Sequence, residues 1–196
     1  MSAPPDGAVE LVERALAYTR GALHGVTPGL LGRPTPCAGW DLDRLLAHMD
    51  DALDAFTEGA GGAVAPAGPD HAPSLPVRLG ALQTKACALL GAWTSSDLPD
   101  VVHVDEVPVP TAVVASAAAL EITLHGWDVA QATGRATPIP AGLATGLLPL
   151  AHALVVDDDR AERFAGALPA PPGADPATRL LAFAGRSPVW ARRLAS

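Results

Sequence analysis

Apolar residues recur at spacings of three and four along four long stretches of the chain. That spacing returns them to one face of an α-helix, because a helix advances about 100° per residue. Glycine and proline clusters separate the stretches, so we expect loops or turns between them. The pattern predicts four long amphipathic helices, over residues 7–26, from Asp41 to the glycine-rich run that starts at Gly59, over 75–93, and from Thr111 to Thr133.

Shorter elements are predicted between and after these helices. Residues 94–110 lack a helical period and alternate briefly, which indicates an extended segment or a small hairpin. Residues 136–156 carry no formal charge but are interrupted by prolines and glycines, which indicates a buried helix with kinks. A last short helix is predicted from Asp175, as its N-cap, to Gly185, as its terminator.

The pattern therefore predicts an all-α protein in which four long helices form a bundle, with one or two extra helical segments at the C-terminal end. A chain of 196 residues is long enough for one sizeable domain and too short for two full ones. We expect a single domain over 1–196, with a bundle core over about 7–163 and a C-terminal helical extension over about 164–196.

The net charge of the chain limits the classes of molecule that we expect it to bind. The chain has 21 acidic and 13 basic residues, a net charge of −8, and hydrophobic residues make up 49% of it. A surface of that sign repels phosphate backbones and acidic lipid headgroups, so we expect neither nucleic-acid nor membrane binding. Small molecules or proteins are the expected partners, and an alanine-rich helix face that can pack closely makes a homodimer plausible.

Two cysteines, Cys37 and Cys87, are too few for a disulfide framework in a chain of this size. The first residues lack the basic start and apolar core of a signal peptide. The charge-free run near residue 145 is too broken to span a membrane. Together these features lead us to expect a cytoplasmic protein.

A candidate metal site lies on two of the predicted helices. Glu121 and His125 are four residues apart and so share one helix face, and His48 lies on the apolar stripe of the second helix. Side chains on facing bundle helices meet in the core, where this architecture builds metal sites. Two histidines and one carboxylate leave coordination positions open and suit zinc, iron(II), manganese or nickel. A buried histidine with an ordinary hydrogen bond, and an i,i+4 bond between Glu121 and His125, remain the alternatives.

Several neighbours can support such a site. Asp128 and Asp51 each follow a candidate histidine by three residues, where a carboxylate can orient a ligand ring; a solvated helix face is the alternative for Asp51. Trp40 and Trp127 can wall the pocket or pack in the core. Cys37, four residues before the second helix, can line the pocket or remain a buried, inert thiol.

Two segments, "TPCAGWDLDRLLAHMDD" and "ALEITLHGWDVAQATGR", resemble the motifs of the mycothiol-dependent maleylpyruvate isomerase family, within the DinB-like group of metal-binding four-helix bundles. The segment "RLLAFAGRSPVW" is similar to the end of the family's short, single-domain members. The resemblance implies that His48, Glu121 and His125 bind a metal, usually zinc, and that mycothiol is the cosubstrate.

A bound divalent cation lowers the pKa of a coordinated thiol or water. We therefore expect a metal-dependent enzyme of thiol-transferase or isomerase type, in which a small thiol such as mycothiol attacks a small electrophile. Two other functions remain open. One is a metal-binding sensor or partner-binding module without catalysis, and the other is a hydrolase or lyase that uses metal-activated water.

Overall fold

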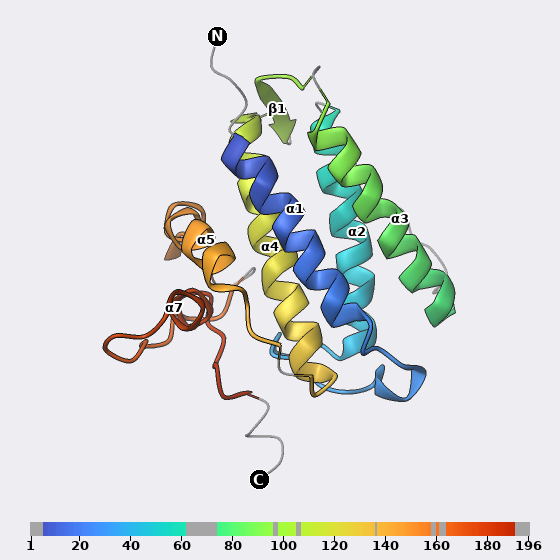
Figure 1. Ribbon diagram of the computed structural model, residues 1–196, viewed down its shortest axis with the longest axis vertical. Helices are drawn as coiled ribbons and strands as arrows, with labels where there is room; N and C mark the ends of the chain where they lie inside the picture. The colour runs from blue at the N-terminus through green and yellow to red at the C-terminus, as the bar shows by residue number, and fades with distance from the viewer. Residues whose placement is uncertain are drawn as a thin grey trace.

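The computed structural model describes residues 6–61, 74–95, 98–104, 107–135, 137–157, 160 and 164–190. It confirms the all-α class, with a single short hairpin among these residues (Figure 1). The elements are α1 (Asp6–Leu23), the 3₁₀ turn η1 (Pro28–Leu30), α2 (Leu42–Ala60), α3 (Leu75–Trp93), β1 (Val101–Val104), β2 (Val107–Pro110), α4 (Thr111–Ala132), α5 (Ala141–Leu154) and α7 (Pro176–Phe183).

The four long helices α1, α2, α3 and α4 lie side by side along the long axis of the molecule, and we call them the bundle (Figure 1). Helices α2 and α3 run in the same direction. The Asp43 carboxylate accepts a hydrogen bond from Arg78 near the start of both helices, at 2.6 Å, and the Phe56 carbonyl accepts one from the Trp93 indole near their ends, at 3.2 Å. Lys85 adds an ion pair midway along them.

Helix α4 is the central helix of the core, and most of its residues are buried. It runs parallel to α1, which it approaches closely at Gly126. A side-chain carbon on Gly126 would lie 3.1 Å from the Cα atom of Thr19, so only glycine allows this spacing. The Thr19 hydroxyl is satisfied by the carbonyl of Ile122, at 2.8 Å. The α1–α4 contact therefore fixes where the polar residues of α4 lie.

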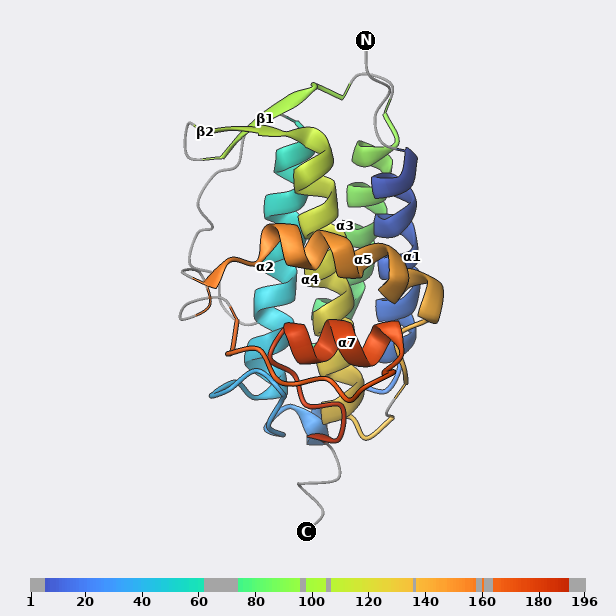
Figure 2. The ribbon, with the colours of Figure 1, turned by 90° about the vertical axis from the view of Figure 1, so that its left-hand side faces the viewer.

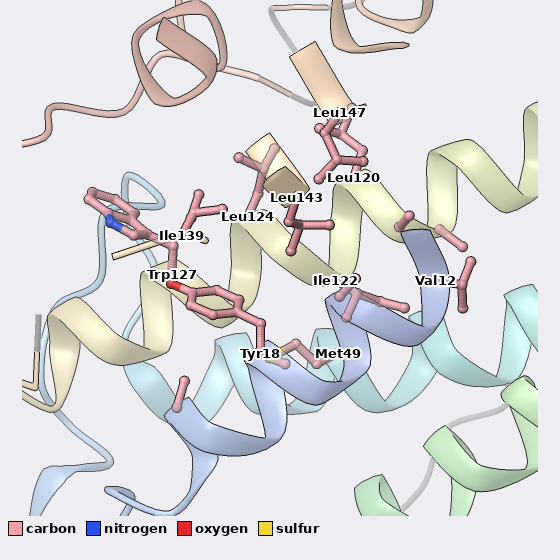
Figure 3. Packing of buried hydrophobic residues seen from close by; sticks show 14 of the residues in the cluster. Val12, Tyr18, Met49, Leu120, Ile122, Leu124, Trp127, Ile139, Leu143 and Leu147 are labelled. Atoms are coloured by element: carbon pink, nitrogen blue, oxygen red, sulfur yellow. The ribbon is translucent and has the colours of Figure 1, made fainter. Parts of the chain in front are cut away.

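Helices α5 and α7 run across the long helices on the outer side of α4 (Figure 2). Leu143 and Leu147 of α5 meet Leu120 and Leu124 of α4, each pair one turn apart (Figure 3). Helix α7 packs against α5 in turn. The C-terminal segment is thereby held against the same core as the bundle.

The predicted caps are largely confirmed. The side chains of Asp41 and Asp175 accept hydrogen bonds from the backbone amides of Arg44 and Thr178, which fixes the first turns of α2 and α7. Ser74 occupies the N-cap position of α3 but its side chain makes no cap hydrogen bond.

Two predicted helix ranges need correction. Helix α1 ends at Leu23, three residues before the predicted end, because the amides of Gly25 and Val26 bond to carbonyls only three residues back and so form a turn. Helix α5 begins at Ala141, because Pro138 and Pro140 keep the residues before it out of the helix. The predicted hairpin is confirmed, with Val102 opposite Val109. The predicted boundary between the bundle core and the C-terminal extension, near residue 163, lies outside the described residues.

Among the described helices, none combines the length and apolarity needed to cross a bilayer.

Candidate metal centre

Helices α2 and α4 bring the three predicted ligands together. Glu121 and His125 are one turn apart on α4, and His48 reaches them from α2. The Oε1 atom of Glu121 lies 2.9 Å from Nε2 of His48 and 2.9 Å from Nε2 of His125. One nitrogen or oxygen atom of each residue lies within 4.8 Å of those of the other two. The three side chains therefore point at one place.

Charge is concentrated at this point. Burial acts to raise the pKa of Glu121, but the charge of His125 and the hydrogen bonds from both imidazoles outweigh burial and hold that pKa well below its usual range. Burial acts to lower the pKa of His125, but the Glu121 carboxylate and the hydrogen bond to Asp128 outweigh it and raise that pKa well above its usual range. Glu121 and His125 thus form an ion pair, with positive charge favoured beside the carboxylate.

The other ring nitrogen of His125 faces a different set of residues. Its Nδ1 atom lies 3.0 Å from Oδ2 of Asp128, whose side chain is fully buried. Arg186 donates from Nη2 to Oδ2, at 2.8 Å, and from Nε to Oδ1, at 3.0 Å, while the Cys37 thiol donates to Oδ2 at 3.2 Å. Burial raises the pKa of Asp128, but Arg186 and His125 lower it overall to about 2. Asp128 is therefore ionised at neutral pH and holds a proton on Nδ1, which directs Nε2 towards Glu121.

We refer to these two groups as the Nε2 side, formed by His48 and Glu121, and the Nδ1 side, formed by Cys37, Asp128 and Arg186. They share the His125 ring between them.

Arg186 is the residue of this cluster that the sequence reasoning missed. Gly185, with φ of 75°, turns the chain after α7, and the Arg186 amide bonds back to the carbonyl of Leu181 at 2.8 Å. Arg186 is 8% exposed. Its partner Asp128 lies 58 residues earlier, so no helical spacing relates the two. The available signal was that Arg186 belongs to the closing segment of the family resemblance.

The two tryptophans have different roles. The Trp40 ring lies 4.9 Å from the His48 ring and 6.4 Å from the His125 ring, centroid to centroid, so it covers both imidazoles. Trp127 is buried in the core beside Ile139 (Figure 3).

Asp51 is exposed on α2, and within the described part of the chain it forms no hydrogen bond with His48. Cys37 is half-buried and belongs to the cluster through its bond to Asp128.

An elongated cavity of about 630 Å³ reaches the site from between α1 and α3. Glu121 and His125 form part of its wall, and most of the rest is apolar. This volume lies within the range of small-molecule pockets, roughly 300–1,000 Å³. The Nε2 side is therefore accessible to a ligand of that size.

The residues of the Nε2 side fit a divalent cation. Together with His125 they offer two imidazole nitrogens and a carboxylate oxygen, the donor set that zinc and iron(II) accept with positions left open. A second grouping of Cys37, His125 and Asp128 also has ligand spacing. In that grouping, however, the Arg186 guanidinium already neutralises Asp128 and lies 3.6 Å from the Cys37 sulfur, so a further cation would be repelled.

Comparison with known proteins points to one family. The sequence model described as the mycothiol maleylpyruvate isomerase N-terminal domain matches residues 12–130. Two uncharacterized proteins of Mycobacterium tuberculosis, from strains CDC 1551 / Oshkosh and ATCC 25618 / H37Rv, are each 30% identical to this chain over 179 residues. Those matches cover 89% of this chain and 95% of each relative.

Among solved structures, the fold is similar to the crystal structure of the mycothiol-dependent maleylpyruvate isomerase, with a TM-score of 0.60 and 18% identity. The similarity covers 77% of this chain and 69% of that chain. At this identity it establishes a shared fold.

Proposed function

Because the chain belongs to the mycothiol maleylpyruvate isomerase N-terminal domain family, a family of mycothiol-related isomerases, we propose that His48, Glu121 and His125 hold a divalent ion, zinc first among the candidates. We propose further that the chain is an enzyme of thiol-transferase or isomerase type with mycothiol as cosubstrate. The observation that carries the proposal is the convergence of three donor atoms within 4.8 Å at the wall of a cavity.

When bound, a divalent cation supplies Lewis acidity, which keeps a thiol deprotonated at neutral pH. Residues around the proposed ligands orient them for binding the ion. Asp128 accepts the Nδ1 proton of His125, so Nε2 is the ring nitrogen that would bind the ion once its own proton is lost. Arg186 keeps Asp128 ionised for that task. Trp40 covers the two imidazole rings and limits the access of water to them.

The proposed reaction is addition of the thiol to an activated double bond. The sulfur forms a bond to the electrophilic carbon, the π bond between the two carbons breaks, and its electron pair moves onto the conjugated carbonyl group. The proton lost by the thiol ends on the carbon next to that carbonyl. Retention of the adduct gives conjugation. Rotation about the carbon–carbon bond that has lost its π bond, followed by loss of the thiol and re-formation of the double bond, gives isomerisation.

Metal analysis of the purified, untagged protein tests the proposal. We expect about one equivalent of metal in the wild type and almost none in His48→Ala, because two remaining ligands hold the ion far more weakly. His103→Ala is the matched control, since His103 is exposed on β1 and belongs to neither grouping with ligand spacing, and this variant should keep its metal. Equal metal content in the wild type and His48→Ala, or none in either, would remove the basis of the proposal.

Turnover distinguishes an enzyme from a binding module. The metal-loaded protein is incubated with mycothiol and a conjugated cis-enone, and both the loss of free thiol and the conversion of the cis isomer into the trans isomer are followed. We expect one of these two changes to depend on the protein and to be absent in His48→Ala. If the wild type binds metal but neither consumes thiol nor isomerises the enone, the site belongs to a non-catalytic module.

A further inference from the structure

The cavity at the metal centre is lined by four helices. Its long walls are α1, from Glu13 to His24, and α3, from Pro76 to Leu90, and its floor is formed by residues of α2 and α4. At about 1.5 Å per residue these walls run for roughly 16 and 21 Å, so the cavity is a groove. Figure 1 shows α1 and α3 with α2 visible between them.

Most of the interior of the groove is hydrocarbon. Leucines of three helices, with Met49 and Ile122, make up most of its walls and floor. Away from Glu121 and His125, the buried polar side chain in the lining is that of Thr19, which already donates its hydroxyl proton to the Ile122 carbonyl. A ligand body in the groove therefore gains by leaving water and finds little to hydrogen-bond with.

The charges near the groove disfavour an anionic ligand. The buried guanidiniums of Arg78 and Arg186 are already paired with Asp43 and Asp128. Arg20 lines the groove from an exposed position, and Glu13, also exposed, brings the opposite charge to the same surface. One carboxylate of a dicarboxylate could pair with positive charge at the candidate metal centre, but the second would lose its hydration without a buried, unpaired arginine or lysine among the described lining residues.

We propose that the groove is the substrate-binding site and that it selects neutral, elongated molecules with a hydrocarbon tail. Their polar, reactive end lies at Glu121 and His125, and the tail lies between α1 and α3. That the polar end is the electrophile of a thiol addition rests on the proposed function; binding of the tail does not. The substrate class is thus an apolar carbonyl compound, in contrast to a small dicarboxylate.

Displacement of the dye Nile red from the full chain tests this inference. The competitors are saturated 2-alkanones of increasing length, which lack a conjugated carbon–carbon double bond and so undergo no conjugate addition by the exposed Cys87 in the groove. We expect affinity to rise up to about fourfold per added methylene, the factor for fully burying one CH₂ group. Maleate, a dianion, should displace no dye at the same concentrations.

A substitution that places a bulky side chain in the groove gives a second test of the same inference. Gly80 lines the groove, and a side-chain carbon there meets nothing within 4 Å, so Gly80→Trp is expected to fold and to lower 2-alkanone affinity at least tenfold. Gly91→Trp is the matched control, because Gly91 lies on the same helix, is equally unobstructed and does not line the groove. Circular dichroism verifies that both variants are folded.

Three results would overturn the inference: affinity independent of chain length, displacement by maleate equal to that by 2-octanone, or equal losses in Gly80→Trp and Gly91→Trp. Failure of the proposed function can be distinguished from failure of this inference. His48 does not line the groove, so His48→Ala should keep its 2-alkanone affinity within about twofold. Length-dependent binding in a protein without metal would support the groove and contradict only the metal centre.

Discussion

The two sides of the His125 imidazole differ in how accessible they are to solvent and to a ligand. On the Nε2 side, Glu121 and His48 are partly exposed, at 24% and 36% of their side chains, and the cavity reaches Glu121. On the Nδ1 side, Asp128 is fully buried and bonded to every other member of its group. One side can exchange protons for a cation, while the other holds the ring in a fixed orientation. The difference shows how a single histidine can combine rigidity with ligand binding.

The charge balance of the two sides differs as well. On the Nδ1 side, one carboxylate meets one guanidinium, so its charge is neutralised by the protein itself. On the Nε2 side, one carboxylate oxygen is shared by two imidazoles, whose charge depends on their protons. A cation can replace those protons, and the favoured position for an ion therefore lies on the Nε2 side.

The largest expected effect comes from removing the charge of the Nδ1 side. Asp128→Asn leaves the Arg186 guanidinium buried without a counter-charge, so we expect the free energy of unfolding to fall by about 3–5 kcal/mol. Loss of the carboxylate that orients His125 should also weaken metal binding by about 10–100-fold. Chemical denaturation and metal titration measure the two effects.

A double variant separates the two effects of that substitution. In Asp128→Asn with Arg186→Met both charges are gone, so we expect at least half of the lost stability to return. Metal affinity should remain low, because His125 still lacks its carboxylate. Arg179→Met, at an exposed position of α7, is the control for the arginine replacement and should change stability little. Recovery of metal affinity in the double variant would contradict the orienting role of Asp128.

A smaller effect is expected at Cys37. Its thiol is a weak donor to an acceptor that already has stronger partners, so Cys37→Ala should lower the free energy of unfolding by about 1 kcal/mol or less. Metal content should not change, as in the control Cys87→Ala. If Cys37→Ala loses its metal, the ion lies on the Nδ1 side, and the comparison drawn above is reversed.

An effect of similar, small size is expected from the cap of α7, the helix that precedes Arg186. Asp175→Ala removes the bonds from the Thr178 amide and hydroxyl and should cost about 1 kcal/mol, whereas Asp175→Asn should retain most of the stability. Those bonds lower the pKa of Asp175 below its usual value of about 4.

The sign of the pH dependence follows from that lowered pKa. The stabilisation by Asp175 is fully present above about pH 4 and is lost as pH falls through the lowered pKa. The stability difference between the wild type and Asp175→Ala, measured by urea denaturation, should therefore shrink in acid. A difference that grows as the pH falls would contradict the role of the carboxylate as a cap.

Much of this site follows from local sequence rules, and the remainder does not. Four-residue spacing places Glu121 and His125 on one face, and an apolar stripe on a second helix directs His48 towards them. The rules do not distinguish Trp40 from Trp127, because each accompanies a motif and only the packing places one over the imidazoles and the other in the core. Nor do they identify Arg186, whose pairing with Asp128 depends on how α7 docks.

The fold, like the site, has features that local sequence rules predict and features that they do not. Periodicity and capping predicted the long helices to within a few residues, since both are properties of neighbouring positions in the chain. The early end of α1 was not predicted, because Val26 remains buried and so continues the apolar pattern beyond the helix itself. An apolar pattern reports burial and not helical conformation. At the end of α1 a residue is buried without being part of the helix.

The distance along the chain between Asp128 and Arg186 sets an order of assembly during synthesis. The ribosome delivers all four bundle helices before it delivers Arg186, so a nascent bundle must hold its central carboxylate without the guanidinium that neutralises it. Only when the segment after α7 arrives does the His125 ring acquire its final support. The segment after α7 therefore completes a site whose other residues were all made earlier.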